Sequence, residues 1–125
     1  MKRVVNTPYA PAPIGPYSQA IIVDKTLYVS GQVAIIPETG AMDMADIPTE
    51  TKRVMENLKA ILIAAQASFD NVVMTTIFLS DMSNFAAVNE VYGSYFKGDF
   101  PARATVAVKT LPKNVNVEIS VIASL

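Results

Sequence analysis

The sequence predicts an α+β domain in which two helices cover one face of a largely antiparallel sheet. Three observations lead to this prediction. Residues 100–122 alternate between apolar and polar side chains with a period of two, as half-buried strands do. Residues 50–67 carry apolar side chains at helical spacing. The whole chain follows the order strand–strand–short strand–helix–strand–helix–strand–strand.

The first forty residues predict an extended arm followed by a pair of strands. Residues 1–16 are rich in proline, so only their opening part suits a short edge strand. Residues 17–23 and 26–31 are expected to form strands on either side of a tight turn at Asp24-Lys25. The chain then stays extended until a second turn at residues 37–40.

Residues 50–67 are predicted to form the longer helix. Thr49 is its expected N-cap, because a hydroxyl at that position accepts a hydrogen bond from a free backbone N–H. Glu50 follows in the first turn, where a negative charge suits the helix dipole. One apolar stripe should face the core. It consists of Val54, Leu58, Ile61, Leu62 and Ala65.

A buried strand and a second helix are expected next. Residues 71–79 are rich in β-branched side chains and predict the strand. Residues 80–83 offer several caps for the helix that follows, and Gly98 is its expected stop. We interpret the apolar stripe of this helix as core packing. The stripe consists of Phe85, Val88, Tyr92 and either Tyr95 or Phe96.

The C-terminal stretch 100–122 is predicted to be a β-hairpin with its turn near Pro112. Residues i and j of such a hairpin pair when i + j is about 223. Thr105 would then lie opposite Glu118, and Arg103 would lie diagonally from Glu118, at roughly 7–8 Å between Cα atoms. The prediction brings an arginine, a hydroxyl and a carboxylate together on the sheet face that does not carry the core. The alternative interpretation is a plain cross-strand ion pair.

Composition restricts both the number of domains and the chemistry. The chain has 125 residues, 51% of them hydrophobic, and suits one packed domain over residues 1–125. Cysteine and histidine are absent, which excludes disulfides, thiolate nucleophiles and histidine bases or metal ligands. Asp43 and Asp46 lie close together but lack a third ligand, so we interpret them as a solvated loop. No metal site is expected.

Charge and hydropathy narrow the class of partner. The formal net charge is −1 and the Lys and Arg residues are scattered, so nucleic acid is not the expected partner. No apolar run reaches ~18 residues and no signal peptide is evident, which favours a cytoplasmic protein without a membrane span. Helices on one side would leave the other sheet face bare, with Ala107 and Ile122 on it. Self-association is therefore expected to cover that face.

Four segments of the chain resemble the RidA/YjgF/UK114 family. They are IGPYSQA (14–20), YVSGQV (28–33), TETKRVMENLKAIL (49–62) and PARATVAV…LPKNVNVEIS (101–120). The resemblance implies a chorismate-mutase-like (YjgF-like) fold. It also implies a homotrimer in which three sheets close a central barrel, with helices outside and ligand clefts between subunits. The implied activity is the cofactor-free hydrolysis of 2-iminobutanoate, 2-iminopropanoate and related imino acids to 2-oxo acids and ammonia.

The resemblance also assigns roles to residues of this sequence. Arg103 matches the arginine that holds the substrate carboxylate, which a planar guanidinium binds through two hydrogen bonds. Glu118 matches the glutamate near the attacking water. Ser30 and Gly31 match a turn whose backbone approaches the ligand. Tyr17 matches an aromatic wall of the cleft, with a core or interface role as the alternative.

Two further positions complete the expected site. Asn89 matches a cleft position on the second helix. Thr105 stands where the family often has a cysteine, so a thiol role does not transfer, whereas water-mediated imine hydrolysis does not require it. Two other functions stay open. One is a non-enzymatic small-molecule sensor or chaperone-like trimer that uses the same cleft. The other is an RNA-cleaving or translation-inhibiting protein, which the lack of histidine and of a basic patch argues against.

Overall fold

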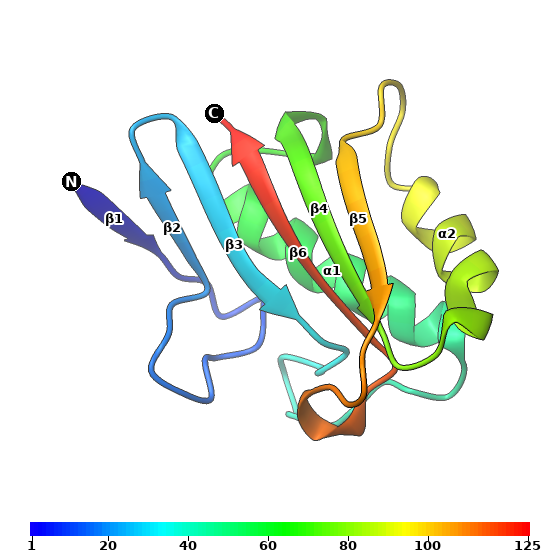
Figure 1. Cartoon of the computed structure of the whole chain (residues 1–125). Helices are drawn as coiled ribbons and strands as arrows, with labels where there is room; N and C mark the ends of the chain where they lie inside the picture. The colour runs from blue at the N-terminus through cyan, green and yellow to red at the C-terminus, as the bar shows by residue number, and fades with distance from the viewer.

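A computed structural model covering residues 1–125 contains one six-stranded mixed sheet in the order β1-β2-β3-β6-β4-β5. Two helices lie on one side of this sheet, and the other side is bare (Figure 1). The strands are β1 (Lys2–Val5), β2 (Ala20–Val23), β3 (Thr26–Gln32), β4 (Val72–Leu79), β5 (Ala102–Ala107) and β6 (Val117–Ser124), and the helices are α1 (Ile47–Ala64) and α2 (Phe85–Gly93). The predicted α+β class, with both helices on one face, is confirmed.

The three N-terminal strands form an antiparallel meander. β2 and β3 pair from Val23↔Thr26 onward, so Asp24-Lys25 is the predicted two-residue turn. Asp24 has a φ of 51°, a left-handed conformation that aspartate tolerates better than most residues. β1 pairs with β2 at the sheet edge, as predicted for the short strand before the prolines. The turn at residues 37–40 is also confirmed.

A buried glutamine holds the proline-rich arm against the sheet. Gln19 is 2% exposed, and its Oε1 accepts a hydrogen bond from Thr7 N at 2.7 Å. Its Nε2 donates to the carbonyl oxygens of Thr7, Ala10 and Pro11. Prolines have no N–H to form a strand ladder, and this one side chain supplies four hydrogen bonds to the arm instead. Nothing in the sequence pattern singled out Gln19.

The predicted C-terminal hairpin is wrong. β5 pairs with β4 in parallel, with Ile77↔Thr105 in register. β6 lies on the other side of β4 and pairs antiparallel to both β3 and β4 (Figure 1). The reason is the connection: α2 links β4 to β5, and a helical crossover returns the chain parallel to the strand that it left. The alternation in residues 100–122 is real, but alternation identifies the two faces of a strand and not its neighbours.

Both predicted helices are confirmed, with shifted ends. α1 begins earlier than expected, and its N-cap is Asp46 and not Thr49: Asp46 Oδ1 accepts a hydrogen bond from Thr49 N at 2.8 Å. Pro48 fits this first turn because its position needs no amide partner. α2 ends at Gly93, before the stop expected at Gly98. Neither helix is long and apolar enough to cross a membrane.

The core lies between the sheet and the helices. Alternate side chains of β3, β4 and β6 point inward and meet the apolar stripe of α1. The buried members are Leu27, Val29, Ile77, Leu79, Val117, Ile119, Val121, Val54, Met55, Leu58, Ile61 and Leu62. Each buried Leu or Ile contributes roughly 1.5–3 kcal/mol relative to an exposed one. The stripe predicted for α1 is confirmed, except that Ala65 is only partly buried.

Aromatic side chains from α2 and the turn after it extend this core. The ring centroids of Tyr92 and Phe96 are 4.9 Å apart. Phe69 contacts Tyr95 at 5.3 Å and Phe96 at 5.4 Å. Tilted and edge-on pairs of this kind stabilise a fold beyond the area that they bury. Core packing of the aromatic stripe, as predicted, is confirmed.

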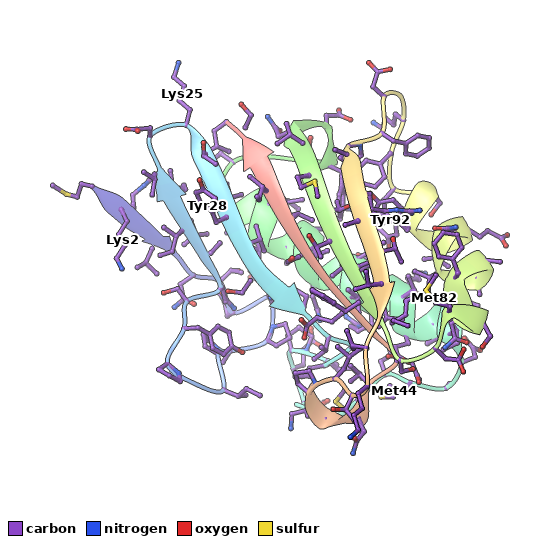
Figure 2. The ribbon with its side chains drawn as sticks, in the orientation of Figure 1. Lys2, Lys25, Tyr28, Met44, Met82 and Tyr92 are labelled. Carbon is purple, nitrogen blue, oxygen red and sulfur yellow. The ribbon has the colours of Figure 1, made fainter.

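The helix-free face of the sheet carries apolar side chains. Tyr28, which Figure 2 labels on β3, is 48% exposed, and Val106 is 46% exposed. Ile122 pairs with Tyr28 and lies on this face as predicted. Ala107 does not, because it aligns with buried Leu79 on the helix side. A bare apolar sheet face is typical of a surface that associates with another protein surface.

A buried carboxylate connects α1 to the start of β6. Glu50 is 0% exposed and accepts hydrogen bonds from Asn116 N at 2.8 Å, Asn116 Nδ2 at 2.9 Å and Val117 N at 3.1 Å. Ser80, next to the end of β4, donates to Asn116 Oδ1 at 2.9 Å. Glu50 does lie in the first turn of α1, as predicted, but its side chain binds β6. Without it, three N–H groups in the interior would lack an acceptor.

We expect Glu50→Ala to lower the free energy of unfolding by about 3 kcal/mol or more, because buried donors lose their acceptor. Urea unfolding followed by circular dichroism measures this change. Glu90→Ala removes an exposed glutamate from α2 and should change stability by less than about 0.5 kcal/mol. An unchanged urea midpoint for Glu50→Ala would contradict the role given to this carboxylate.

Candidate functional site

The predicted site residues divide between the two faces of the sheet. Arg103 aligns with buried Thr75 across the β4–β5 pair, so Arg103 and Thr105 point to the helix face. Glu118 alternates with the buried residues of β6 and points to the bare face. The predicted convergence of Arg103, Thr105 and Glu118 within one chain is wrong, because β4 separates β5 from β6. We call Arg103, Thr105 and Asn89 the arginine group, and Tyr17, Ser30, Gly31 and Glu118 the glutamate group.

The arginine group lies between β5 and α2. Arg103 Nη1 donates to Asn89 Oδ1 at 2.7 Å. The guanidinium carbon lies 5.5 Å from the centroid of the Phe85 ring and 5.3 Å from that of Tyr92, which are distances typical of cation–π contacts. Tyr92 is labelled between β5 and α2 in Figure 2. A cavity of about 470 Å³ opens beside Arg103 and is also lined by Phe100.

Thr105 brings an unsatisfied hydroxyl to this group. It lies two residues after Arg103 and on the same face of β5. Its Oγ1 is buried and has no hydrogen-bond partner in the chain. Leaving a buried polar group unpaired costs on the order of 1–3 kcal/mol. Thr105 does not line the cavity beside Arg103, so its hydroxyl is a candidate ligand contact only through its place on the same face of β5.

The glutamate group is organised by the contact between Glu118 and Gly31. A Cβ built on Gly31 would lie 2.7 Å from Glu118 Oε2 and 2.9 Å from its Cδ, so only glycine leaves room for the carboxylate. Gly31 lies where the β3–β6 register shifts between Val29 and Gln32. Burial raises the pKa of the Glu118 carboxyl, with no cation or hydrogen-bond donor opposing it. A cross-strand ion pair with Arg103 is excluded by the geometry, because the two residues lie on opposite faces of the sheet with β4 between their strands.

Ser30 joins the same strand irregularity to the segment before β2. Its Oγ donates to Ser18 O at 2.6 Å, and its backbone N donates to Gln19 O at 2.9 Å. Tyr17, which is 48% exposed, lines a cavity of about 400 Å³ together with Ser30. The structure thus brings Tyr17 to Ser30, and Gly31 to Glu118, as members of one surface. Tyr17 is not a core residue.

Sequence reasoning missed two residues that contact Arg103. Phe85 and Tyr92 were assigned to the core on their helical spacing alone. The missing signal was present in the same spacing, because residues 85, 89 and 92 fall on one side of a helix and Asn89 was already a site candidate. The structure does bring Asn89 to Arg103, through the hydrogen bond between their side chains.

A larger cavity, of about 580 Å³, lies elsewhere, between α1 and α2. It is lined by Pro48, Thr49, Lys52, Ala87, Glu90, Val91, Ser94 and Tyr95, and contains none of the predicted site residues. No group of three or more acidic side chains suited to a metal ion occurs in the chain. Cavity size alone therefore does not select the candidate site, and we base the choice on the perturbed and unpaired polar groups.

Known proteins resemble the chain over its whole length. It matches the family described as Endoribonuclease L-PSP over residues 7–125. The chain belongs to this family, the RidA/YjgF family. A 2-iminobutanoate/2-iminopropanoate deaminase of Mus musculus is 48% identical over 123 residues, or 98% of this chain and 91% of the relative.

Solved structures agree with this assignment. The Rid family protein YyfA of Yersinia pestis has a TM-score of 0.97 at 48% identity, over 100% of both chains. The YjgF gene product of E. coli has a TM-score of 0.93 at 38% identity, over 98% of both chains. The predicted YjgF-like fold is confirmed.

In this RidA/YjgF protein, Gly31→Ala should push the Glu118 carboxyl out of its half-buried position. The backbone of Gly31 is not left-handed, and the new methyl group meets the far end of a flexible side chain, so the fold should survive. We expect the pKa of Glu118 to fall toward the ordinary value of a glutamate, because its desolvation is relieved. Titration of the carboxyl carbon by NMR measures this. Gly98→Ala, at a glycine with open space around it, is the matched control.

The raised pKa of Glu118 also predicts how stability depends on pH. A carboxyl whose folded pKa lies above its unfolded value of 4.5 destabilises the fold once ionised, so its cost appears as pH rises through the folded pKa. We expect Glu118→Gln to be more stable than the wild-type RidA/YjgF protein at pH 7, with the difference shrinking toward pH 4. Thermal melts across this range measure the effect. Glu38→Gln, at an exposed loop position, should show no such trend, and a constant difference for Glu118→Gln would contradict the explanation.

Proposed function

We propose that this protein hydrolyses 2-imino acids, 2-iminobutanoate and 2-iminopropanoate among them, to 2-oxo acids and ammonia. The observation that carries the proposal is the state of Arg103. Its guanidinium borders a cavity and is held by an amide and two aromatic rings, while the one ion pair of the chain joins Arg53 to Asp43 elsewhere. A cation with no carboxylate of its own suits a small carboxylate ligand. The name of the mouse relative supports the same chemistry.

The proposed reaction needs water and no cofactor. Water adds to the C=N carbon of R–C(=NH)–COO⁻, the resulting carbinolamine loses ammonia, and R–C(=O)–COO⁻ remains. Arg103 binds the carboxylate through two parallel hydrogen bonds and so fixes the plane of the imine. Glu118 takes a proton from the attacking water and returns it to the leaving nitrogen. A pKa raised by burial suits a carboxylate for both transfers.

The remaining site residues have supporting roles in this proposal. The unpaired hydroxyl of Thr105 hydrogen-bonds the ligand beside Arg103. Ser30 and Gly31 let backbone approach the reacting carbon, and Tyr17 forms an apolar wall. Asn89 accepts a hydrogen bond from Arg103 and lines the same cavity, so it orients the guanidinium beside the ligand.

A complete site of this kind requires a second subunit. Within one chain, Arg103 lies on the helix face and Glu118 on the bare face, with β4 between their strands. We therefore place Arg103 of one subunit opposite Glu118 of the next in a homotrimer. The bare faces, with Tyr28, Val106 and Ile122, line a central barrel in this arrangement, and the ligand clefts lie between subunits. The exposed apolar area of these faces supports such an assembly.

Activity should depend on Arg103. A threonine dehydratase generates 2-iminobutanoate in the assay, and loss of the imine is followed with and without the protein. We expect wild type to accelerate the loss and Arg103→Ala to be slowed by about 100-fold, the effect of losing a bidentate charged contact. Lys109→Ala, at an exposed cation two residues beyond β5, is the matched control and should behave as wild type.

Mixing two inactive variants tests the shared site. Random trimers of Arg103→Ala and Glu118→Gln would regain about one quarter of the wild-type sites, since each site takes one group from each neighbour. Recovery of no activity after unfolding and reassembly together would contradict the division between subunits. Full activity of Arg103→Ala, or no acceleration by wild type, would remove the deaminase proposal. Cleavage of single-stranded RNA that is lost in Arg103→Ala would favour the ribonuclease alternative.

A further inference from the structure

The surroundings of Arg103 go beyond the contact with Asn89. Phe85, Asn89 and Tyr92 are spaced i, i+4 and i+7 along α2, so all three lie on one side of this helix. That side faces Arg103, whose guanidinium carbon is 5.5 Å from the Phe85 ring and 5.3 Å from the Tyr92 ring. The guanidinium is therefore within cation–π range of both rings, and it donates a hydrogen bond to Asn89, which lies between Phe85 and Tyr92 along the helix.

Tyr92 is itself held in place by a hydrogen bond to β4. Its hydroxyl forms a hydrogen bond of 2.8 Å with Thr75 Oγ1, and Thr75 is 0% exposed. Thr75 is also the residue of β4 that aligns with Arg103 of β5. The ring thus lies beneath Arg103, anchored to the strand next to it. Burial raises the pKa of Tyr92, against smaller opposing effects of Thr75 and Arg103, so the residue presents a neutral ring.

Aromatic rings and a carboxylate differ in what they leave available on a guanidinium that they hold. A guanidinium has five N–H donors. An aromatic face attracts the positive charge of the guanidinium without accepting a hydrogen bond from any of these donors. Asn89 takes one donor of Arg103 and is uncharged. An aspartate or glutamate in the same place would accept two donors and cancel the charge. The observed environment leaves the charge and most of the donors of Arg103 available.

We propose that Phe85 and Tyr92 are positioning residues that hold the Arg103 guanidinium in the orientation in which it receives a ligand carboxylate. This inference rests on the proposed role of Arg103 as carboxylate anchor and extends it to the two rings that contact the guanidinium, of which Tyr92 also lines the cavity beside Arg103. Free arginine side chains sample many rotamers, and restricting them before binding lowers the entropy lost on binding. The two rings and Asn89 together supply that restriction.

The test measures affinity for 2-oxobutanoate, a stable 2-oxo acid, by NMR titration of the folded protein. We expect Arg103→Ala to abolish binding, and Phe85→Leu and Tyr92→Leu each to weaken it by about fivefold to tenfold. Tyr92→Phe keeps the ring and should retain most of the affinity. In the imine assay, the leucine variants should raise KM by a similar factor and change kcat less than twofold, because the anchor acts equally on substrate and transition state.

Tyr95→Leu is the matched control. Tyr95 also packs in the aromatic core and also uses its hydroxyl in a hydrogen bond, to Glu56 Oε2 at 2.7 Å, but it has no contact with Arg103. It should lower the melting temperature as Tyr92→Leu does and leave affinity unchanged. Equal weakening by Tyr95→Leu would overturn the proposal, because general loss of packing would then explain the effect. Phe85→Leu provides a second variant if Tyr92→Leu does not fold.

The outcomes separate this proposal from the proposed function. If Arg103→Ala abolishes binding while Phe85→Leu and Tyr92→Leu bind as wild type does, the positioning role is wrong and the anchor stands. If Arg103→Ala binds as wild type does, the anchor is wrong and the positioning role fails with it. If wild type binds 2-oxobutanoate but leaves the imine untouched, hydrolysis is wrong, and the affinities of the leucine variants still decide the role of the rings.

Discussion

The hydrogen bonds that Glu50 accepts from Asn116 and Val117 fix where β6 enters the sheet. β6 occupies the centre, between β3 and β4, and its inward side chains form much of the core with α1. Every other strand takes its place relative to this one. β4 pairs on one side of β6 and carries β5 to the outer edge. The position of β6 therefore decides how far Glu118 lies from Arg103.

The separation of these two charged groups has a chemical effect on both. Side by side, a guanidinium would lower the pKa of the glutamate and the carboxylate would neutralise the arginine. Each would then be a weaker partner for a ligand. In the observed fold, Glu118 is desolvated without a counterion, and Arg103 keeps its charge among rings and an amide. In the proposed deaminase, the arginine therefore stays available to bind a carboxylate and the glutamate to transfer a proton.

The elements of the fold could be predicted because each depends on local pattern. The stripe of α1, the turn at Asp24-Lys25 and the buried strand β4 follow from periodicity and turn chemistry alone. The neighbour of β5 could not be predicted in this way. Residues 108–116 contain proline and asparagine and are short enough for a hairpin. Only the three-dimensional path, with Lys113 and Asn114 at φ values of 57° and 54°, carries β6 past β4.

Sequence reasoning could propose members of the candidate site but not their arrangement. Strand alternation singled out Arg103 and Glu118, and the family resemblance assigned their roles, but neither gives the face of the sheet on which each lies. The burial of polar residues such as Glu50 and Gln19 was not predicted, because glutamate and glutamine are usually exposed. The contact between the Tyr92 ring and Arg103 was not predicted for a different reason. Helical spacing indicates that a ring is buried, but it does not show whether a leucine or a guanidinium covers the ring. Tertiary contacts decide such cases.

The shortness of α2 gives the site a mechanical property. α2 has nine residues, and no side chain caps its N-terminus by a hydrogen bond. A helix of this length is held by packing and not by its own propensity, so it opens locally more easily than α1. Opening would release Phe85, Asn89 and Tyr92 from Arg103 in one event. By thermodynamic linkage, a ligand that needs the ordered arginine would also favour the closed helix, so occupancy of the proposed cleft and the population of ordered α2 would rise together.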